Sequence, residues 1–198
     1  MGNVLVDYDP DYILDCHGVI NESERQLLLD NIFYSAGWHK MDLGIYDEAD
    51  LYKDALKTLP PSLHETLKDI CDHWYESLLP IPGMEELICS LKQRGFRIYL
   101  LSNAAHSKDL YWQNVPGHRY FDGTIVSAFE GCIKPERRIY EILLERYGLK
   151  AQECLFIDDM PANVQGARNA GMDAYLFNND PEDLEKYIMD KAYGKEIN

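Results

Sequence analysis

The sequence has few basic residues and no long hydrophobic run. Its 198 residues include 19 Lys and Arg against 34 Asp and Glu, a net charge of −15. Binding to nucleic acid or to an anionic membrane surface needs clustered Lys and Arg, so neither partner is expected. No segment approaches the roughly 20 apolar residues of a membrane span. The first residues, MGNVLVDYDPDY, also lack the basic flank and apolar stretch of a secretory signal.

Cysteines are few, odd in number and scattered along the chain. The five are Cys16, Cys71, Cys89, Cys132 and Cys154, with no C-x-x-C spacing. We therefore expect neither a disulfide framework nor a zinc site. We expect a reduced, cytoplasmic location instead. Hydrophobic residues make up 46% of the chain and charged residues 27%, which is ordinary for a globular protein. The length fits one domain that contains an inserted subdomain.

The pattern of the sequence changes near Pro80. Residues 10–79 show helical periodicity and no convincing strand, whereas helices and strands alternate after Pro80. Capping boxes are predicted at Asn21 with Glu24 and at Ser62 with Glu65. Asp180 and Pro181 are expected to begin the final helix. We therefore expect a core domain formed by residues 1–9 and 80–198, and a helical cap subdomain formed by residues 10–79. The oligomeric state is not indicated by the sequence.

Short apolar runs in the second part of the chain predict buried strands. They cover residues 96–101, 124–126, 154–157 and 174–177. Continuous apolar strands that alternate with helices are typical of a parallel sheet with helices on both faces. The predicted fold class is therefore α/β, with a Rossmann-like parallel sheet.

Polar residues follow two of these strands directly. Ser102 and Asn103 end one, and Asp158 and Asp159 end another. Ligands of such sheets bind beyond the carboxyl ends of the strands. Two adjacent carboxylates suit Mg²⁺, which prefers oxygen ligands. Asn163, one helical turn further on, is placed to orient a carboxylate.

Ser102 and Asn103 are also expected to start a helix, whose free N–H groups would hold a phosphate oxygen. Lys134, directly before Pro135, would complete a charge clamp on a phosphoryl group. Each feature also has a simpler interpretation, because Asp and Ser commonly cap helices and a single lysine is usually a surface residue.

Three segments together resemble the haloacid dehalogenase (HAD) superfamily. They are RIYLLSN, IKPERRIYEILLERYGL and CLFIDDMPANVQGARNAGM, which are similar to its second, third and fourth motifs in order and spacing. The resemblance covers residues 80–178, and residues 10–79 are similar to the family's helical C1 cap. The branch that the chain resembles is subfamily IA, which contains sugar-phosphate phosphatases such as glucose-1-phosphate phosphatase.

The resemblance implies a role for each matching residue. Ser102, with Asn103 beside it, would bind the phosphoryl group, and Lys134 would neutralise its charge. Asp159 would ligate Mg²⁺ directly, and Asp158 would ligate it directly or through water. Members of the family attack phosphorus with an aspartate, form an aspartyl-phosphate and then hydrolyse it.

The first motif of the family, which carries the nucleophile, matches only in part. Aligned on D-x-G-N-V, Gly2 and Asn3 fall at phosphate-binding positions, and the nucleophilic aspartate falls one residue before Met1. The central strand would precede it, so this register leaves a gap in the middle of the sheet, with unpaired backbone groups on both neighbouring strands. We favour this register and expect the natural protein to start a few residues earlier. The alternative is that residues 3–7 occupy the central position.

Two other registers give different nucleophiles. In the first, Asp7 is the nucleophile and Asp9 the acid/base, although Pro10 then stands where the motif has glycine. In the second, Asp15 is the nucleophile and His17 replaces the second acid. The favoured register puts Gly2 at the usual acid/base position, so Asp7 or a residue of the cap would supply the proton instead.

The cap is expected to select the substrate. Trp38 and Asp42 are candidates to line it, whereas Trp74 is expected in the core. The favoured function is Mg²⁺-dependent hydrolysis of a small phosphorylated metabolite, in particular a sugar phosphate. A dehalogenase of the same fold is the alternative, and paired carboxylates argue against it because that chemistry needs no metal. A non-catalytic protein that binds phosphate or metal is a third possibility, and a phosphomutase is a fourth.

Overall fold

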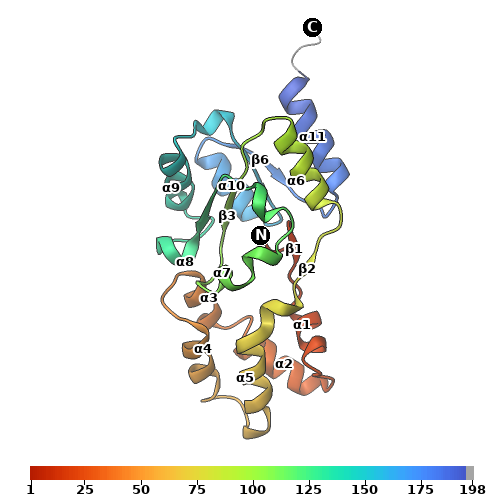
Figure 1. Cartoon of the computed structure of the whole chain (residues 1–198). Coiled ribbons are helices and arrows are strands. Elements are labelled where there is room, and N and C mark those ends of the chain that lie inside the picture. The colour runs from red at the N-terminus through yellow and green to blue at the C-terminus, as the bar shows by residue number, and fades with distance from the viewer. Residues whose placement is uncertain (195–198) are drawn as a thin grey trace.

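The computed structural model describes residues 1–194, and its helices form two groups (Figure 1). Helices α1 to α5 lie together at one end of the molecule. The other helices surround the strands at the opposite end. The helices are α1 (Pro10–Cys16), α2 (Glu22–Asn31), α3 (Ala36–Asp42), α4 (Glu48–Ala55), α5 (His64–His73), α6 (Met84–Gln93), α7 (Lys108–Tyr111), α8 (Ser127–Glu130), α9 (Arg137–Tyr147), α10 (Pro161–Asn169) and α11 (Pro181–Tyr193). No helix among the described residues is long and apolar enough to span a membrane.

Several helix starts follow from local sequence. The side chain of Asn21 accepts hydrogen bonds from the N–H groups of Ser23 and Glu24 and so caps α2. Asp180 caps α11 in the same way, with Pro181 at the first helical position. Both caps were predicted.

The strands form three separate pairs. The strands are β1 (Val6–Asp7), β2 (Leu79–Pro80), β3 (Tyr99–Ser102), β4 (Gly123–Val126), β5 (Leu155–Asp158) and β6 (Asp173–Leu176). β3 pairs with β4 and β5 with β6, both in parallel, whereas β1 pairs with β2 in antiparallel fashion. No strand among residues 1–194 joins β3 to β5. The parallel arrangement was predicted correctly, and the break between β3 and β5 agrees with the gap that the favoured register leaves in the middle of the sheet.

The N-terminal residues form a compact turn in place of a central strand. The carbonyl oxygen of Met1 accepts hydrogen bonds from the N–H groups of Val4, Leu5 and Val6. Asn3 has φ of 55°, a left-handed conformation that asparagine tolerates better than most residues. Residues 3–7 therefore do not take the central position, and Val6–Asp7 pairs with the chain that returns from α5.

Two apolar clusters hold the strands and helices together. The larger cluster contains residues of helices α1 to α7 and of α11, and Leu14, Leu28, Leu67 and Ile70 are fully buried in it. The smaller one packs β3, β4, β5 and β6 against α9 and α10 and includes the fully buried Tyr140. The second cluster is the part of the core that positions the site.

Candidate active site

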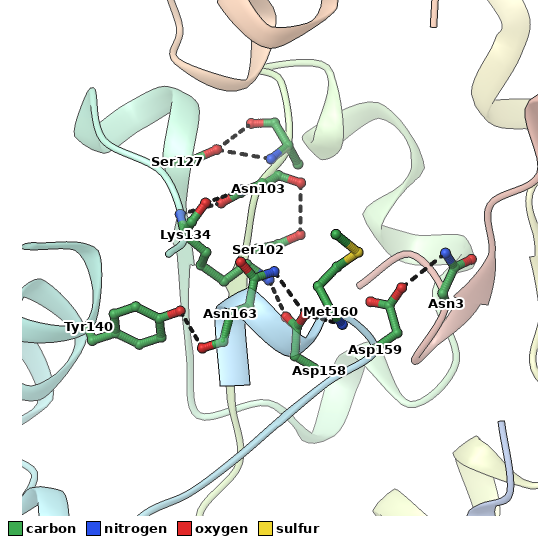
Figure 2. A network of polar contacts seen from close by, with 11 residues as sticks. Asn3, Ser102, Asn103, Ser127, Lys134, Tyr140, Asp158, Asp159, Met160 and Asn163 are labelled. Atoms are coloured by element: carbon green, nitrogen blue, oxygen red, sulfur yellow. Dashed lines mark hydrogen bonds and ion pairs between the residues drawn. The ribbon is translucent and has the colours of Figure 1, made fainter. Parts of the chain in front are cut away.

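A buried ion pair lies where the strands end. The Nζ atom of Lys134 lies 2.6 Å from Oδ2 of Asp158, and their side chains are 5% and 4% exposed. Lys134 comes from the loop between α8 and α9, and Asp158 is the last residue of β5. The pair therefore connects the two parallel strand pairs at their carboxyl ends (Figure 2).

The other oxygen of Asp158 is also occupied. Oδ1 accepts hydrogen bonds from the N–H of Met160 at 3.0 Å and from the side-chain amide of Asn163 at 2.8 Å. Burial by itself raises the pKa of Asp158. The charge and hydrogen bond of Lys134, with the bonds from Asn163 and Met160, more than offset this, so its pKa lies below the usual range. Asp158 is therefore ionised at neutral pH.

Asn163 is positioned by α10 and by a buried tyrosine. It lies in the first turn of α10, and Tyr140 in α9 donates a hydrogen bond from its hydroxyl to the carbonyl oxygen of Asn163 at 2.7 Å. The predicted role for Asn163, orientation of a carboxylate, agrees with this geometry. The sequence did not single out Tyr140, which looked like one apolar position among several on α9.

The side chain of Asn103 forms two hydrogen bonds with the backbone of Lys134. Its amide nitrogen donates to the carbonyl oxygen of Lys134 at 3.1 Å, and its Oδ1 accepts the N–H of Lys134 at 2.8 Å. Ser102 is 2% exposed, and its hydroxyl donates to the carbonyl oxygen of Asn103 at 3.2 Å. Figure 2 shows both side chains next to Lys134. Asn103 therefore fixes the loop that carries the lysine.

The helix predicted to begin at Ser102 and Asn103 is not present, which corrects that expectation. The next helix, α7, begins at Lys108. The N–H of Ala104 donates to the hydroxyl oxygen of Ser127 at 3.0 Å, so it takes part in a tertiary contact. Ser127 is fully buried and directly follows β4, as Ser102 ends β3. The sequence signal that could have identified Ser127 is its place as a polar residue directly after the apolar strand β4.

Asp159 has a different environment from Asp158. It is partly exposed, and its Oδ2 accepts a hydrogen bond from the side-chain amide of Asn3 at 3.2 Å. Asn3 in turn accepts the N–H of Tyr8 at 3.0 Å. No cation among residues 1–194 forms an ion pair with Asp159. Its carboxylate is therefore the more available of the two for a metal ion.

The donor set fits Mg²⁺. Mg²⁺ in proteins usually keeps several waters and binds one or two carboxylates together with substrate phosphate oxygens. Asp158 and Asp159 supply two such carboxylates. Within the described part of the chain no group of three or more His, Cys, Asp or Glu side chains could form a fuller cage.

The N-terminal residues contribute to the same cluster. The α-amino group of Met1 is buried close to Lys134, Asp158 and Asp159. Burial, with the charge of Lys134, lowers its pKa to about 5. Gly2 lies so close to Tyr8 that a Cβ there would be 3.2 Å from that of Tyr8. Asn3 therefore borders the cluster through its hydrogen bond to Asp159.

Asp7 lies apart from these residues. It is exposed in β1 and pairs through its backbone with Leu79. Among the described residues, no hydrogen bond or ion pair connects its carboxylate to the cluster. The structure therefore does not bring Asp7 together with the other predicted site residues.

Trp38 and Asp42 both lie in α3. The Trp38 ring is 6.0 Å from that of Tyr8 and 5.0 Å from that of Trp74, measured between centroids. Trp74 is buried in the core, as predicted. Burial raises the pKa of Asp42 to about 7, although the charge of Lys134 lowers it in part. Asp42 is thus a carboxyl group with no hydrogen bond or ion pair among the described residues, in the electrostatic range of Lys134.

The cluster can bind an anion and a divalent cation side by side. Lys134 and the Ser102 hydroxyl supply a cation and a donor, and the adjacent carboxylates supply metal ligands. Fixed groups of this kind stabilise charge that develops on a transferring phosphoryl group. The fold and the site together define an α/β protein with its site at the carboxyl ends of parallel strands.

Comparison with protein families identifies the class. Residues 34–171, more than half of the chain, match the model of the haloacid dehalogenase-like hydrolases. The chain therefore belongs to this hydrolase family, which confirms the resemblance seen in its motifs.

Curated relatives include phosphatases. The chain is 30% identical over 118 residues to a glyceraldehyde 3-phosphate phosphatase of Methanothermobacter thermautotrophicus, covering 58% of this chain and 51% of the relative. It is 28% identical over 153 residues to flavin mononucleotide hydrolase 1 of Arabidopsis thaliana, covering 77% of this chain and 61% of the relative. The chain thus spans about half to three-fifths of the length of these relatives.

Solved structures share the fold. A HAD family enzyme from Bacteroides thetaiotaomicron, crystallised with magnesium and inorganic phosphate, superposes with a TM-score of 0.66 at 21% identity, covering 88% of this chain and 89% of the other. A dehalogenase gives a TM-score of 0.68 at 22% identity, covering 89% and 81%. These similarities confirm the α/β fold class but do not discriminate between the two chemistries.

Proposed function

We propose that the protein is a Mg²⁺-dependent phosphatase that hydrolyses a small phosphorylated metabolite. The observation that carries the proposal is the contact of Lys134 with Asp158, with Asp159 directly beside them at the carboxyl ends of β3 and β5. The names of two relatives, a glyceraldehyde 3-phosphate phosphatase and a flavin mononucleotide hydrolase, support this substrate class. A carbon–halogen bond offers no phosphoryl charge for Asp158 and Asp159 to balance through a metal, so a dehalogenase fits less well.

The nucleophile in this proposal is an aspartate, as the resemblance to the family implies. The carboxylate attacks phosphorus, the alcohol leaves with a proton, and an aspartyl-phosphate forms. Water then attacks the phosphorus, which releases inorganic phosphate and regenerates the carboxylate. Bound Mg²⁺ would neutralise charge on the phosphoryl oxygens.

The residues of this chain hold the phosphoryl group and its charge. Lys134 balances charge on Asp158 and on a phosphoryl oxygen. Ser102 can turn its hydroxyl from the carbonyl oxygen of Asn103 to a phosphoryl oxygen, because both acceptors lie at the end of β3. Asn103 keeps Lys134 in place through its two backbone bonds.

A sugar phosphate is the favoured substrate within this class. Gly2 occupies the position where the family has an acid, so the leaving group receives less help from a proton donor. An anomeric oxygen of a sugar 1-phosphate needs less help than an ordinary alcohol. Trp38 and Asp42, which approach from α3, are the proposed contacts to the rest of the substrate. Residues 10–79 would then act as the cap.

The test is hydrolysis of p-nitrophenyl phosphate, glucose 1-phosphate, glyceraldehyde 3-phosphate and flavin mononucleotide, with MgCl₂ or with EDTA. Asp159→Asn should abolish Mg²⁺-dependent turnover, whereas Lys150→Met, at an exposed ion pair on the opposite end of β5, should not. Turnover that is unaffected by EDTA and by Asp159→Asn would refute the proposal. Binding of Mg²⁺ and phosphate without turnover of any substrate would favour the non-catalytic protein.

A further inference from the structure

The side of α3 that faces the site carries a carboxyl group without a partner. Asp42 is half-buried at the end of α3 and has no hydrogen bond or ion pair among the described residues. The chain packs tightly against the core at this point, because a Cβ on Gly44 would overlap the carbonyl oxygen of Ala128 in α8. The charge of Lys134 acts on Asp42. Asp42 therefore lies opposite the Lys134 cluster, on the far side of the same site.

Aromatic rings border this carboxyl group. Trp38 precedes Asp42 by four residues and so lies on the same face of α3. The rings of Trp38 and Tyr8 are only partly buried, and their centroids lie 6.0 Å apart at an interplanar angle of 37°. Burial, with the charge of Asp42, raises the pKa of the Tyr8 hydroxyl. No lysine or arginine of residues 1–194 lies over either ring, so their faces are free of the chain's own cations.

A second carboxylate lies further inside the same interface. Oε1 of Glu48, the first residue of α4, is buried and has no hydrogen-bond partner, and the same is true of Nε1 of Trp74. The Trp74 ring lies 5.0 Å from that of Trp38 and 5.7 Å from that of Tyr111, measured between centroids. Burial, with the charges of Asp42 and Glu48, raises the pKa of Tyr111. Both carboxylates therefore lie around one hydroxyl, and neither has a cation to balance it.

The lysines of the neighbouring helices are engaged elsewhere. Nζ of Lys40 in α3 lies 3.1 Å from the hydroxyl of Tyr46 and over the face of that ring. Nζ of Lys108 in α7 lies 2.8 Å from Oδ1 of Asp109. A carboxylate in a partly buried, aromatic environment is unfavourable unless a positive charge or hydrogen-bond donors balance it. The described part of the chain supplies neither to the two carboxylates of α3 and α4.

We propose that Tyr8, Trp38 and Asp42 form a binding site for an ammonium group of the substrate, with Glu48 adding negative charge from further inside. Ammonium groups are attracted by the faces of aromatic rings, most strongly by tryptophan, and they donate to carboxylates. Because the charge of Lys134 acts on Asp42, the ammonium and phosphoryl groups belong to one small molecule. The substrate class is therefore the phosphate ester of an amino alcohol or an amino sugar. This inference rests on the proposed phosphatase function and narrows its substrate.

The charge of the whole protein supports an ammonium group on the substrate. The net charge of −15 repels a phosphate ester, which is itself an anion. An ammonium group lowers the net negative charge of the ester and adds an attraction of its own. Burial raises the pKa of Asp42 to about 7 in the protein by itself, and a bound ammonium group would stabilise the ionised carboxylate.

The other occupants fit less well. The hydroxyl groups of a neutral sugar could donate to Asp42 but would leave its charge unbalanced. A flavin ring could stack on Trp38, yet it brings no cation to the carboxylate. An inorganic cation would need more oxygen ligands, and no group of three or more metal-binding side chains exists among residues 1–194. An organic ammonium group uses the aromatic faces and the carboxylate together.

The test compares pairs of phosphate esters that differ in the ammonium group alone. Ethanolamine phosphate is paired with n-propyl phosphate, and glucosamine 6-phosphate with glucose 6-phosphate. In the original protein kcat/KM should be at least about tenfold higher for the ammonium member of at least one pair. Asp42→Asn should remove this preference without lowering kcat/KM for the uncharged member. Asp50→Asn, which removes a carboxylate 3.1 Å from Lys53 in an exposed ion pair of α4, is the control and should keep it.

Binding of the same esters is measured separately, so that the result does not depend on turnover. The measurement uses tryptophan fluorescence in EDTA, where the proposed reaction has no Mg²⁺. The ammonium member should bind at least about tenfold more tightly than its partner, and Asp42→Asn should abolish the difference. Trp38→Leu, a second variant that keeps Asp42, should weaken binding of the ammonium members only.

The two measurements distinguish failure of this inference from failure of the proposed function. Equal affinity within both pairs, or no binding at all, would overturn the ammonium site, and so would a preference that survives in both variants. A preference in binding without turnover of any ester would keep the ammonium site and count against the phosphatase. Turnover of both members with equal affinity and equal kcat/KM would support the phosphatase and overturn the ammonium site.

Discussion

Replacing Lys134 by methionine removes the ammonium group that pairs with Asp158 and keeps most of the volume of the side chain. The two charged groups are 2.6 Å apart and almost fully buried. The hydrogen bonds from Met160 and Asn163 remain in the variant, so the defect is the lost cation. Removing one partner of a buried pair leaves an uncompensated charge, which costs about 3–5 kcal/mol.

We therefore expect Lys134→Met to lower the free energy of unfolding by that amount at pH 7.5, measured by urea unfolding followed by circular dichroism. Small proteins have about 5–15 kcal/mol of stability, so the variant should still fold. Lys150→Met is the matched control, because Lys150 and Glu153 are 2.8 Å apart but largely exposed. This control should show no resolvable change.

The stability difference between Lys134→Met and the original protein should depend on pH. In the original protein the pKa of Asp158 lies below its usual range, so the stability from the pair is present above about pH 4 and is lost as the pH falls through the folded value. Without Lys134, burial raises the pKa of Asp158, and protonation relieves the penalty in acid. The difference between the two proteins should shrink from pH 7.5 to 4.5.

Two outcomes would refute this reasoning. One is a Lys134→Met variant as stable as the original protein at pH 7.5. The other is a stability difference that stays constant down to pH 4.5. The double variant with Asp158→Asn provides a further check, because it removes the stranded charge and should recover much of the lost stability.

Three other residues give separate predictions. Burial raises the pKa of Asp42 to about 7, so the free energy of unfolding should fall as the pH rises from about 4 to 7. Asp42→Asn should abolish this fall, which should be on the order of 2–4 kcal/mol between pH 5 and pH 8 when measured by urea unfolding. Asp159→Asn should weaken Mg²⁺ binding measured by isothermal titration calorimetry without lowering the unfolding midpoint in EDTA, because Asp159 is partly exposed. Gly166→Ala should destabilise the protein by about 1–3 kcal/mol. The new Cβ would lie 2.8 Å from the carbonyl oxygen of Pro135 and 2.8 Å from the Tyr140 hydroxyl oxygen. An unchanged unfolding midpoint would show that the neighbouring groups move aside without cost.

The sequence was informative where a local signal decides the structure. The caps at Asn21 and Asp180, and the polar ends of β3 and β5, depend on neighbouring residues and were predicted correctly. The capping box expected at Ser62 was wrong. A short 3-10 turn, Pro61–Leu63, occupies that position, and α5 begins at His64 without a side-chain cap.

Contacts between distant segments could not be predicted in the same way. Asn103 was expected to help begin a helix, but its side chain binds the backbone of a residue 31 positions away. Ser127 binds Ala104 across 23 positions. Both depend on how β3 and β4 pair, and neither follows from helical or strand periodicity.

The site residues also stabilise the fold, because they connect its two strand pairs. Asn103 links the end of β3 to the Lys134 loop, and Lys134 links that loop to Asp158 at the end of β5. These contacts bridge the side of the sheet where β3 and β5 do not pair. Active sites often reduce stability, since their groups are arranged for reaction and not for folding. Here we expect the opposite for Asn103, Lys134 and Asp158, because their contacts hold together two strand pairs that share no backbone hydrogen bond among residues 1–194.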